Sequence, residues 1–226
     1  GVLRAFYVEG GDETVRHAFD GALGALREAG ASIVDIELPH ARFAIPVYYL
    51  VCTAEASSNL ARYDGVKYGY RTPIGREDTL TSMYSRTRDE GFGAEVKRRI
   101  MLGTYALSAG YYDAFYLKAL QVRTLMRRDY DLAFQTVDVV AMPTSPVPPF
   151  RLGEKVDDPL QMYLNDIFTV SANLAGLPGI SIPCGFSGGL PVGVQFIGRM
   201  FDEASILRVA DAHERATEWH RRSPAD

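Results

Sequence analysis

One arginine stands where a helix would otherwise present only apolar side chains. A helix predicted over residues 92–101 carries its apolar residues at intervals of four, beginning with Phe92. At about 100° per residue, Arg99 falls beside Phe92 on that face, whereas its two basic neighbours Lys97 and Arg98 point away. The pattern therefore predicts one inward-facing guanidinium on this helix.

An aspartate stands in the same kind of position on a second predicted helix, over residues 158–174. Met162 and Val170 mark the apolar edge of that helix, and Asp166 lies between them. Asn173 falls on the same side. Asp166 is therefore a second charged residue that we expect to face inward.

Inward-facing charges of opposite sign are either paired with other protein groups or satisfied by a ligand. One interpretation is a structural ion pair between Arg99 and Asp166, or pairing with local backbone groups. The other is a pocket for a small zwitterion, in which Arg99 binds a carboxylate with both arms of its guanidinium and Asp166 binds an ammonium. From the residues alone, both interpretations stay open.

No residue in a recognisable setting could supply a catalytic nucleophile. The sequence holds no Ser–His–Asp arrangement, GxSxG turn or GxxxxGK[ST] phosphate loop. Ser57 and Ser58 lie among small residues that let a helix pack closely against a neighbour, and Ser145 lies in a proline-rich turn without a nearby base. We therefore assign no catalytic residue to this chain.

Metal binding is not expected either. Cys52 and Cys184 are too few and too far apart for a thiolate site or a disulfide framework. The four histidines are scattered, without a pair at ligand spacing. We expect both cysteines to be buried, reduced thiols.

The composition is that of an ordinary globular protein. The 226 residues are 47% hydrophobic and 23% charged. A net charge of −4 gives no general attraction to nucleic acids or anionic membranes. No apolar run approaches the roughly 18 residues of a membrane helix. We expect no signal peptide and no membrane contact, and hence a cytoplasmic protein.

The elements that must position these residues begin with a strand–helix–strand unit. Residues 2–8 read as an apolar strand and residues 32–38 as a second strand. The helix between them is expected to begin after Asp12 and to end at Gly30. This unit predicts a right-handed crossover in an α/β sheet. The chain starts directly on an apolar strand without an initiator methionine, which favours a fragment whose sheet lacks strands on at least one side.

The middle of the chain is predicted to be helical, and later strands complete the sheet before a last helix. The predicted elements are helices over 46–62, 92–101 and 104–134, a Gly/Tyr/Arg-rich loop over 63–71, strands over 137–142, 180–183 and 192–197, and a helix over 202–216. We therefore expect an α/β fold with a mixed sheet flanked by helices.

Four blocks of sequence carry a resemblance to a known family. They are EASSNLARYDG with the following YGYR (residues 55–71), EGFGAEVKRRI continuing to residue 114, residues 157–179 ending in NLAGLPG, and GLPVGVQFIGR (residues 189–199). They resemble the A subunits of glutamyl-tRNA(Gln)/aspartyl-tRNA(Asn) amidotransferases, in the amidase signature family. The last two blocks occur across that family, whereas the first two are more specific to the tRNA-linked subunits.

The resemblance implies an amidase-signature fold that is incomplete in this chain. Residues 1–226 would form the C-terminal half of a single amidase domain, with a helical segment over about 40–134 between sheet strands. The family's Ser–Ser–Lys triad belongs to the other half. No catalytic residue can therefore be carried over, and the chain alone is expected to be inactive.

The implied activity is that of a glutaminase subunit. It would hydrolyse glutamine and supply ammonia for converting Glu-tRNA(Gln) to Gln-tRNA(Gln). The implied partners are the B and C subunits, with Glu-tRNA(Gln), ATP and Mg²⁺ handled by the B subunit. No cofactor is expected in this chain.

The resemblance also assigns glutamine-binding residues, which fall on Tyr48, Arg99 and Asp166. In the family, the arginine contacts the carboxylate of glutamine and the aspartate contacts its ammonium. Two of these three residues are the ones that helical geometry singled out, which favours the ligand interpretation over an ion pair. Only its family position singles out Tyr48 from the other tyrosines.

Two alternatives stay open, the second from another functional class. The chain could be part of another amidase-signature hydrolase, but enzymes acting on aryl or fatty amides need no clamp for a zwitterion. It could instead be a non-catalytic fragment or assembly module. The sequence does not distinguish Gln-tRNA formation from Asn-tRNA formation.

Overall fold

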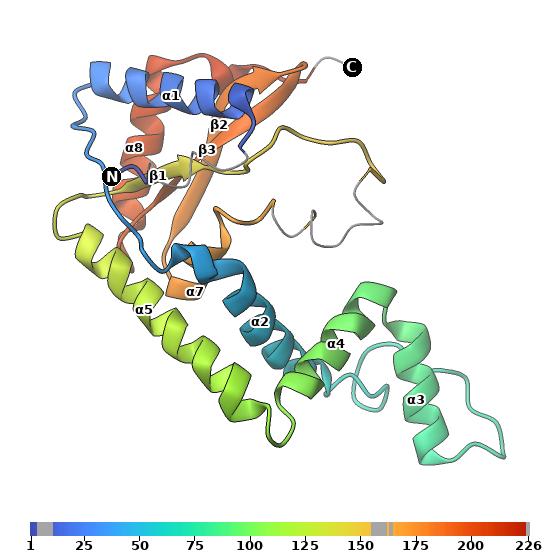
Figure 1. The fold of residues 1–226 in the computed structure, drawn as a ribbon. Helices are drawn as coiled ribbons and strands as arrows, with labels where there is room; N and C mark the ends of the chain where they lie inside the picture. The colour runs from blue at the N-terminus through green and yellow to red at the C-terminus, as the bar shows by residue number, and fades with distance from the viewer. Residues whose placement is uncertain (4–10, 155–161, 163–164, 225–226) are drawn as a thin grey trace. The chain divides into compact units, whose positions relative to one another are not determined.

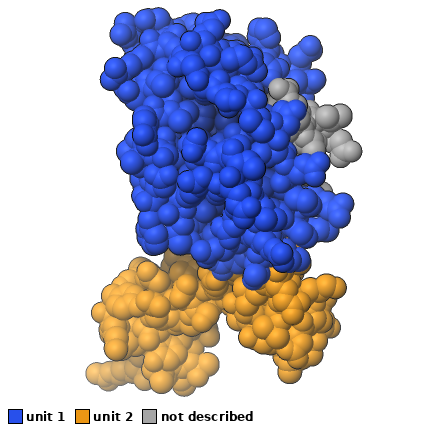
Figure 2. Space-filling view, turned by 90° about the vertical axis from the view of Figure 1, so that its left-hand side faces the viewer, with its two compact units in different colours: residues 1–45, 123–226 blue, residues 46–122 orange. Residues whose placement is uncertain are grey.

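A computed structural model describes residues 1–3, 11–154, 162 and 165–224. The chain divides into two compact units (Figure 2). Unit 1 comprises Gly1–Ile45 and Arg123–Asp226, and unit 2 comprises Pro46–Val122. None of the helices within the described ranges is long and apolar enough to cross a membrane.

Unit 1 is built on a three-stranded antiparallel sheet in the order β1-β3-β2. Its strands are β1 (Val140–Pro143), β2 (Gly179–Ser187) and β3 (Leu190–Ile197). Strands β2 and β3 form a hairpin whose turn residues, Gly188 and Gly189, have φ of 56° and 81°. Such left-handed backbone favours glycine and matches the twist of the paired strands.

The strand–helix–strand unit predicted at the start of the chain lies only partly within the described residues. Val2 forms isolated parallel bridges with Asp35 and with Ala141. Most of the strand predicted over 2–8 lies outside the described residues. The strand predicted over 32–38 is wrong as an extended element, because its only pairing in the described chain is the bridge at Asp35.

The sheet has a hydrophobic core on each face. Val139 and Ala141 join one core, while Val140 and Met142 join the other, as the alternation of side chains along a strand requires. Helices α1 (Glu13–Glu28) and α8 (Glu203–Ala216) pack together on the first face (Figure 1). Residues of α5 (Lys118–Ala133) and α7 (Val170–Ala175) contribute to the second core. The expected α/β fold with helices flanking a sheet is confirmed, although the three strands are antiparallel and parallel pairing in the described residues is limited to the bridges of Val2.

The ends of α1 and α8 follow the capping residues in the sequence. The Asp12 carboxylate accepts a hydrogen bond from the Thr14 amide at 2.8 Å, and Gly30 has a φ of 100° just beyond the helix. Asp202 accepts one from the Ser205 amide at the start of α8. Both helices agree with the predictions.

The middle of the chain is helical, mostly within unit 2. Its helices are α2 (Ala44–Leu60), α3 (Leu80–Gly91), α4 (Ala94–Ala106) and a short π-helix (Tyr112–Leu117) that leads into α5. Helices α2 and α4 correspond to the predictions over 46–62 and 92–101. The helix predicted over 104–134 is confirmed over residues 112–133 but wrong as a single element, because the chain breaks after α4 and turns at Gly110, whose φ is 85°. Helix α3 was not predicted.

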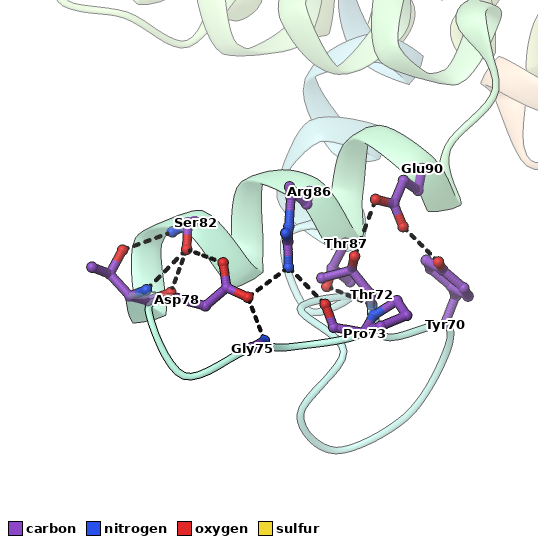
Figure 3. Close-up of polar contacts among 10 residues, drawn as sticks. Tyr70, Thr72, Pro73, Gly75, Asp78, Ser82, Arg86, Thr87 and Glu90 are labelled. Carbon is purple, nitrogen blue, oxygen red and sulfur yellow. Dashed lines mark hydrogen bonds and ion pairs between the residues drawn. The ribbon is translucent and has the colours of Figure 1, made fainter.

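Helix α3 and the loop before it are joined by side-chain hydrogen bonds (Figure 3). Thr79 and Ser82 form a reciprocal capping box at the start of the helix. Arg86 donates to the Pro73 carbonyl at 2.7 Å and to Asp78 at 2.9 Å. Glu90 accepts from the Tyr70 hydroxyl at 2.5 Å. Polar contacts therefore hold this part of unit 2 together where apolar burial is slight.

Candidate functional site

Arg99 and Tyr48 come together in unit 2, from different helices. Arg99 lies on α4, and its Nη1 donates to the hydroxyl of Tyr48 on α2 at 2.9 Å. Its Nε donates to Glu95 Oε1 at 2.9 Å, four residues earlier on α4. The Arg99 side chain is 27% exposed, compared with 52% for that of Arg98. The predicted inward orientation of Arg99 relative to Arg98 is confirmed.

This arrangement leaves part of the guanidinium available. A guanidinium carries more N–H donors than the contacts with Tyr48 and Glu95 use. Among the described residues, these two are the polar partners of the Arg99 side chain. The remaining donors can bind a carboxylate.

The charge states at this site suit an anionic ligand. Burial lowers the pKa of Arg99, but hydrogen bonds to Glu95 and Tyr48 outweigh this effect and raise the pKa above its ordinary value. Burial also raises the pKa of Tyr48, against the lowering effect of its hydrogen bond with Arg99. Tyr48 therefore stays a neutral phenol that accepts from Arg99, and the Cys52 side chain lies beside it as a further cause of the raised pKa.

The pair depends on a close approach of two helices. A Cβ on Gly103 of α4 would lie 1.9 Å from the backbone oxygen of Thr53 on α2, a contact that no side chain can make. Thr53 itself is 2% exposed. Gly103 therefore lets the two backbones touch, which brings Tyr48 and Arg99 within hydrogen-bond reach.

Asp166 lies in unit 1, in a turn that precedes α7. Residues 165–169 form turns, and α7 begins at Val170. The helix predicted over 158–174 is therefore wrong at residues 165–169. The helical geometry used to place Asp166 and Asn173 on one face does not hold. Both residues are exposed in this chain. Convergence of Asp166 with Arg99 stays a prediction.

Unit 1 has a cavity of its own, of about 490 Å³, whose lining includes four prolines and two valines. The hydroxyls of Thr144 and Ser181 hydrogen-bond there at 2.6 Å, over the space that Gly193 leaves open. Among the described residues, no histidine, lysine or carboxylate lines the cavity. These hydroxyls therefore have no base beside them, within that part of the chain, that could activate them as nucleophiles.

Neither metal ligation nor nucleophilic chemistry at Cys184 is supported by the described ranges. They contain no group of three or more His, Cys, Asp and Glu side chains placed to hold a metal ion. The expectation that both cysteines are buried is wrong for Cys52, which is half-buried. Cys184 is buried, and burial raises the pKa of its thiol to about 12. That thiol is protonated at neutral pH and unsuited to nucleophilic attack.

Two residues of this site were missed by sequence reasoning. Glu95 could have been found from its spacing, because a glutamate four residues before an arginine on a helix lies on the same face. Gly103 could not have been found this way, since its role depends on the path of the α2 backbone.

Comparison with known families places most of the chain in one of them. The family model described as amidase matches residues 1–207. The chain belongs to the amidase family. In this amidase-family chain, the 207 matched residues include all three residues predicted to bind the substrate.

The relatives found are subunits of one kind of enzyme. The chain is 58% identical over 224 residues to the A subunit of glutamyl-tRNA(Gln) amidotransferase from Carboxydothermus hydrogenoformans, covering 99% of this chain and 46% of the relative. It is 58% identical over 224 residues to the same subunit from Myxococcus xanthus, again covering 46% of the relative. The amidase-family chain thus spans about half the length of the curated relatives it matches.

Solved structures share the fold. The crystal structure of the glutamyl-tRNA(Gln) amidotransferase A subunit from Thermotoga maritima matches with a TM-score of 0.71 and 40% identity, covering 95% of this chain and 41% of that one. A crystal structure of an amidase matches with a TM-score of 0.72 at 22% identity, covering 44% of that chain. The amidase-signature fold is therefore confirmed, with about half of it present here.

Proposed function

We propose that this chain supplies the glutamine-binding side of a glutamyl-tRNA(Gln) amidotransferase A subunit. The observation that carries the proposal is the Arg99–Tyr48 hydrogen bond at 2.9 Å. It joins two residues from separate helices in a chain that is more than half identical to such subunits. A guanidinium held by Glu95 and Tyr48, with donors left over, suits the α-carboxylate of an amino acid.

In this proposal, Asp166 binds the α-ammonium of the same glutamine. The two charged groups of a free amino acid are attached to one carbon, so recognition requires opposite charges that converge from different elements. Glutamate would satisfy this clamp equally well. Selection for the side-chain amide therefore falls to residues outside this chain.

The remaining steps are assigned to the rest of the enzyme. A Ser–Ser–Lys triad outside this chain would attack the glutamine amide, form a glutamyl ester and release ammonia. The B and C subunits would be the partners, and the B subunit would use ATP and Mg²⁺ to convert Glu-tRNA(Gln) to Gln-tRNA(Gln). The proposed enzyme acts in the cytoplasm and needs no cofactor in this chain.

The test is Arg99→Ala in the full amidotransferase. Loss of the charge-assisted contact should weaken glutamine binding by about 2–5 kcal/mol, seen mainly as a higher KM for glutamine. Asp166→Asn should raise the same KM. Ammonium chloride bypasses glutamine hydrolysis, so ammonia-driven amidation should stay nearly unchanged in both variants.

Lys97→Ala is the matched control, because Lys97 lies on the same helix and pairs instead with Asp89 at 2.6 Å. It should keep the KM of the unmodified enzyme. Equal damage to glutamine-driven and ammonia-driven amidation by Arg99→Ala would show that Arg99 is structural, and the proposal would fail.

A further inference from the structure

Glu95 lies between two arginines at the start of α4. Its Oε1 accepts from Arg99 Nε at 2.9 Å, and its Oε2 accepts from Arg98 Nη1. Gly93 caps the helix, so Glu95 stands in the first turn. Its side chain is 45% exposed, compared with 27% for Arg99. The carboxylate is thus fixed at the edge of the Arg99–Tyr48 pair.

The two acceptors hold the Arg99 guanidinium at two different nitrogens. Glu95 holds Nε from the same helix, and Tyr48 holds Nη1 from α2. One acceptor alone would leave a long side chain free to rotate about that contact. Two acceptors fix both the position and the plane of the guanidinium before any ligand arrives, which lowers the entropy lost on binding.

The charges around Glu95 also leave a net attraction for an anionic ligand. A carboxylate beside Arg99 would by itself repel the carboxylate of a ligand. Here the second oxygen of Glu95 is bound by Arg98, so the three side chains together keep one net positive charge. Glu95 can therefore orient Arg99 without cancelling the attraction for an anion.

We propose that Glu95 is a positioning residue that orients Arg99 toward the α-carboxylate of glutamine. Glu95 makes no contact with the substrate in this proposal and acts only through the direction of the guanidinium. The inference rests on the proposed function, since it requires Arg99 to bind glutamine.

The experiment compares Glu95→Gln and Glu95→Ala in the full amidotransferase, with Arg99→Ala and Lys97→Ala alongside. Glu95→Ala removes the acceptor for Nε and should raise the KM for glutamine about tenfold. Glu95→Gln keeps an acceptor oxygen of the same shape and should raise it only about threefold. In both variants kcat for glutamine and the rate with ammonium chloride should change little. Lys97→Ala should leave all three quantities unchanged.

The outcomes separate the inference from the function on which it rests. If Arg99→Ala raises the KM while both Glu95 variants keep the original KM, the positioning role is wrong and the proposed function stands. If Arg99→Ala leaves the KM unchanged, both are wrong. If the Glu95 variants lower ammonia-driven and glutamine-driven rates together, Glu95 is merely structural. Glu95→Gln preserves the volume of the side chain, so this variant tests the role even if Glu95→Ala folds poorly.

Discussion

Polar side chains buried in unit 1 are nearly all hydrogen-bonded, and His213 is the exception among the described residues. Gln195 donates to the carbonyls of Pro143 and Phe168 at 3.0 and 2.9 Å. The Tyr130 hydroxyl lies 2.8 Å from that of Ser171. His213 is 0% exposed, and neither of its ring nitrogens has a hydrogen-bond partner in the described part of the chain. A buried ring without partners is most stable when it is neutral.

His213 should make the stability of the chain depend on pH. Burial lowers the pKa of His213 below 6.5, a lowering that Glu214 opposes and His220 adds to. As the pH falls below about 6.5, the unfolded chain takes up a proton that the folded chain resists, so stability decreases. The loss is at most about 1.4 kcal/mol per pH unit, or roughly 3–5 °C in Tm, and it stops growing once the folded chain also binds the proton. Thermal unfolding between pH 7.5 and 5.5 measures this loss.

The variant His213→Leu should flatten that decrease, because the group that titrates is gone. His17→Ala is the control, since His17 is exposed on α1 and its loss should leave the slope as it was. A slope that is the same in His213→Leu and in the original chain would assign the effect to other groups.

At the scale of elements, the close contact between α2 and α4 is what we expect to hold Tyr48 beside Arg99. Gly103→Ala would place a Cβ against the Thr53 carbonyl, so the helices must separate. We expect a loss of about 1–3 kcal/mol in unfolding free energy and a higher KM for glutamine as Tyr48 and Arg99 move apart. Thermal unfolding and glutamine kinetics of the same preparation measure both.

Gly24→Ala is the matched control for that substitution. Gly24 lies within α1 and has no heavy atom within 4 Å of an added Cβ. Alanine there should stabilise the chain by roughly 0.5–1 kcal/mol through its higher helix propensity. If both glycine variants were equally stable, the steric account of Gly103 would be wrong.

How well each element could be predicted from the sequence depends on what stabilises it. Helix α1 and strand β3 bury a regular apolar pattern, and the predictions found both. Helix α3 buries only Met83 and Thr87 and relies on polar contacts with a loop, so apolar periodicity gave no signal. The break after α4 depends on the conformation of Gly110, which a helical pattern can run across.

The residues of the candidate site could likewise be predicted only in part from the sequence. Arg99 was found because its charge interrupts an apolar face, and Tyr48 because of a family resemblance. Asp166 was selected with helical angles for a segment that is not helical, so its geometry was wrong although its assignment to the ligand remains a prediction. Glu95 and Gly103 act through distances between particular atoms, which residue types alone do not specify.

For the whole molecule, the chain is predicted to have no glutaminase activity when it is purified alone. It spans about half the length of its relatives, the Ser181 hydroxyl has no base beside it among the described residues that line its cavity, and burial raises the pKa of the Cys184 thiol. An ammonia-release assay with glutamine should give the background rate, while the full amidotransferase assayed in parallel turns over. Release above background from the isolated chain would reveal a nucleophile among these residues.

The division of the chain into units sets an order of events during synthesis. Unit 2 is one continuous stretch, complete once residue 122 has left the ribosome. Unit 1 is interrupted: Phe19 packs in the same core as Val194 and Phe196, which are translated after unit 2. Helix α1 must therefore wait, with its apolar face uncovered, until unit 2 and the residues that lead to the β2–β3 hairpin are made. Chaperone binding to nascent chains should accordingly persist until the β2–β3 hairpin emerges.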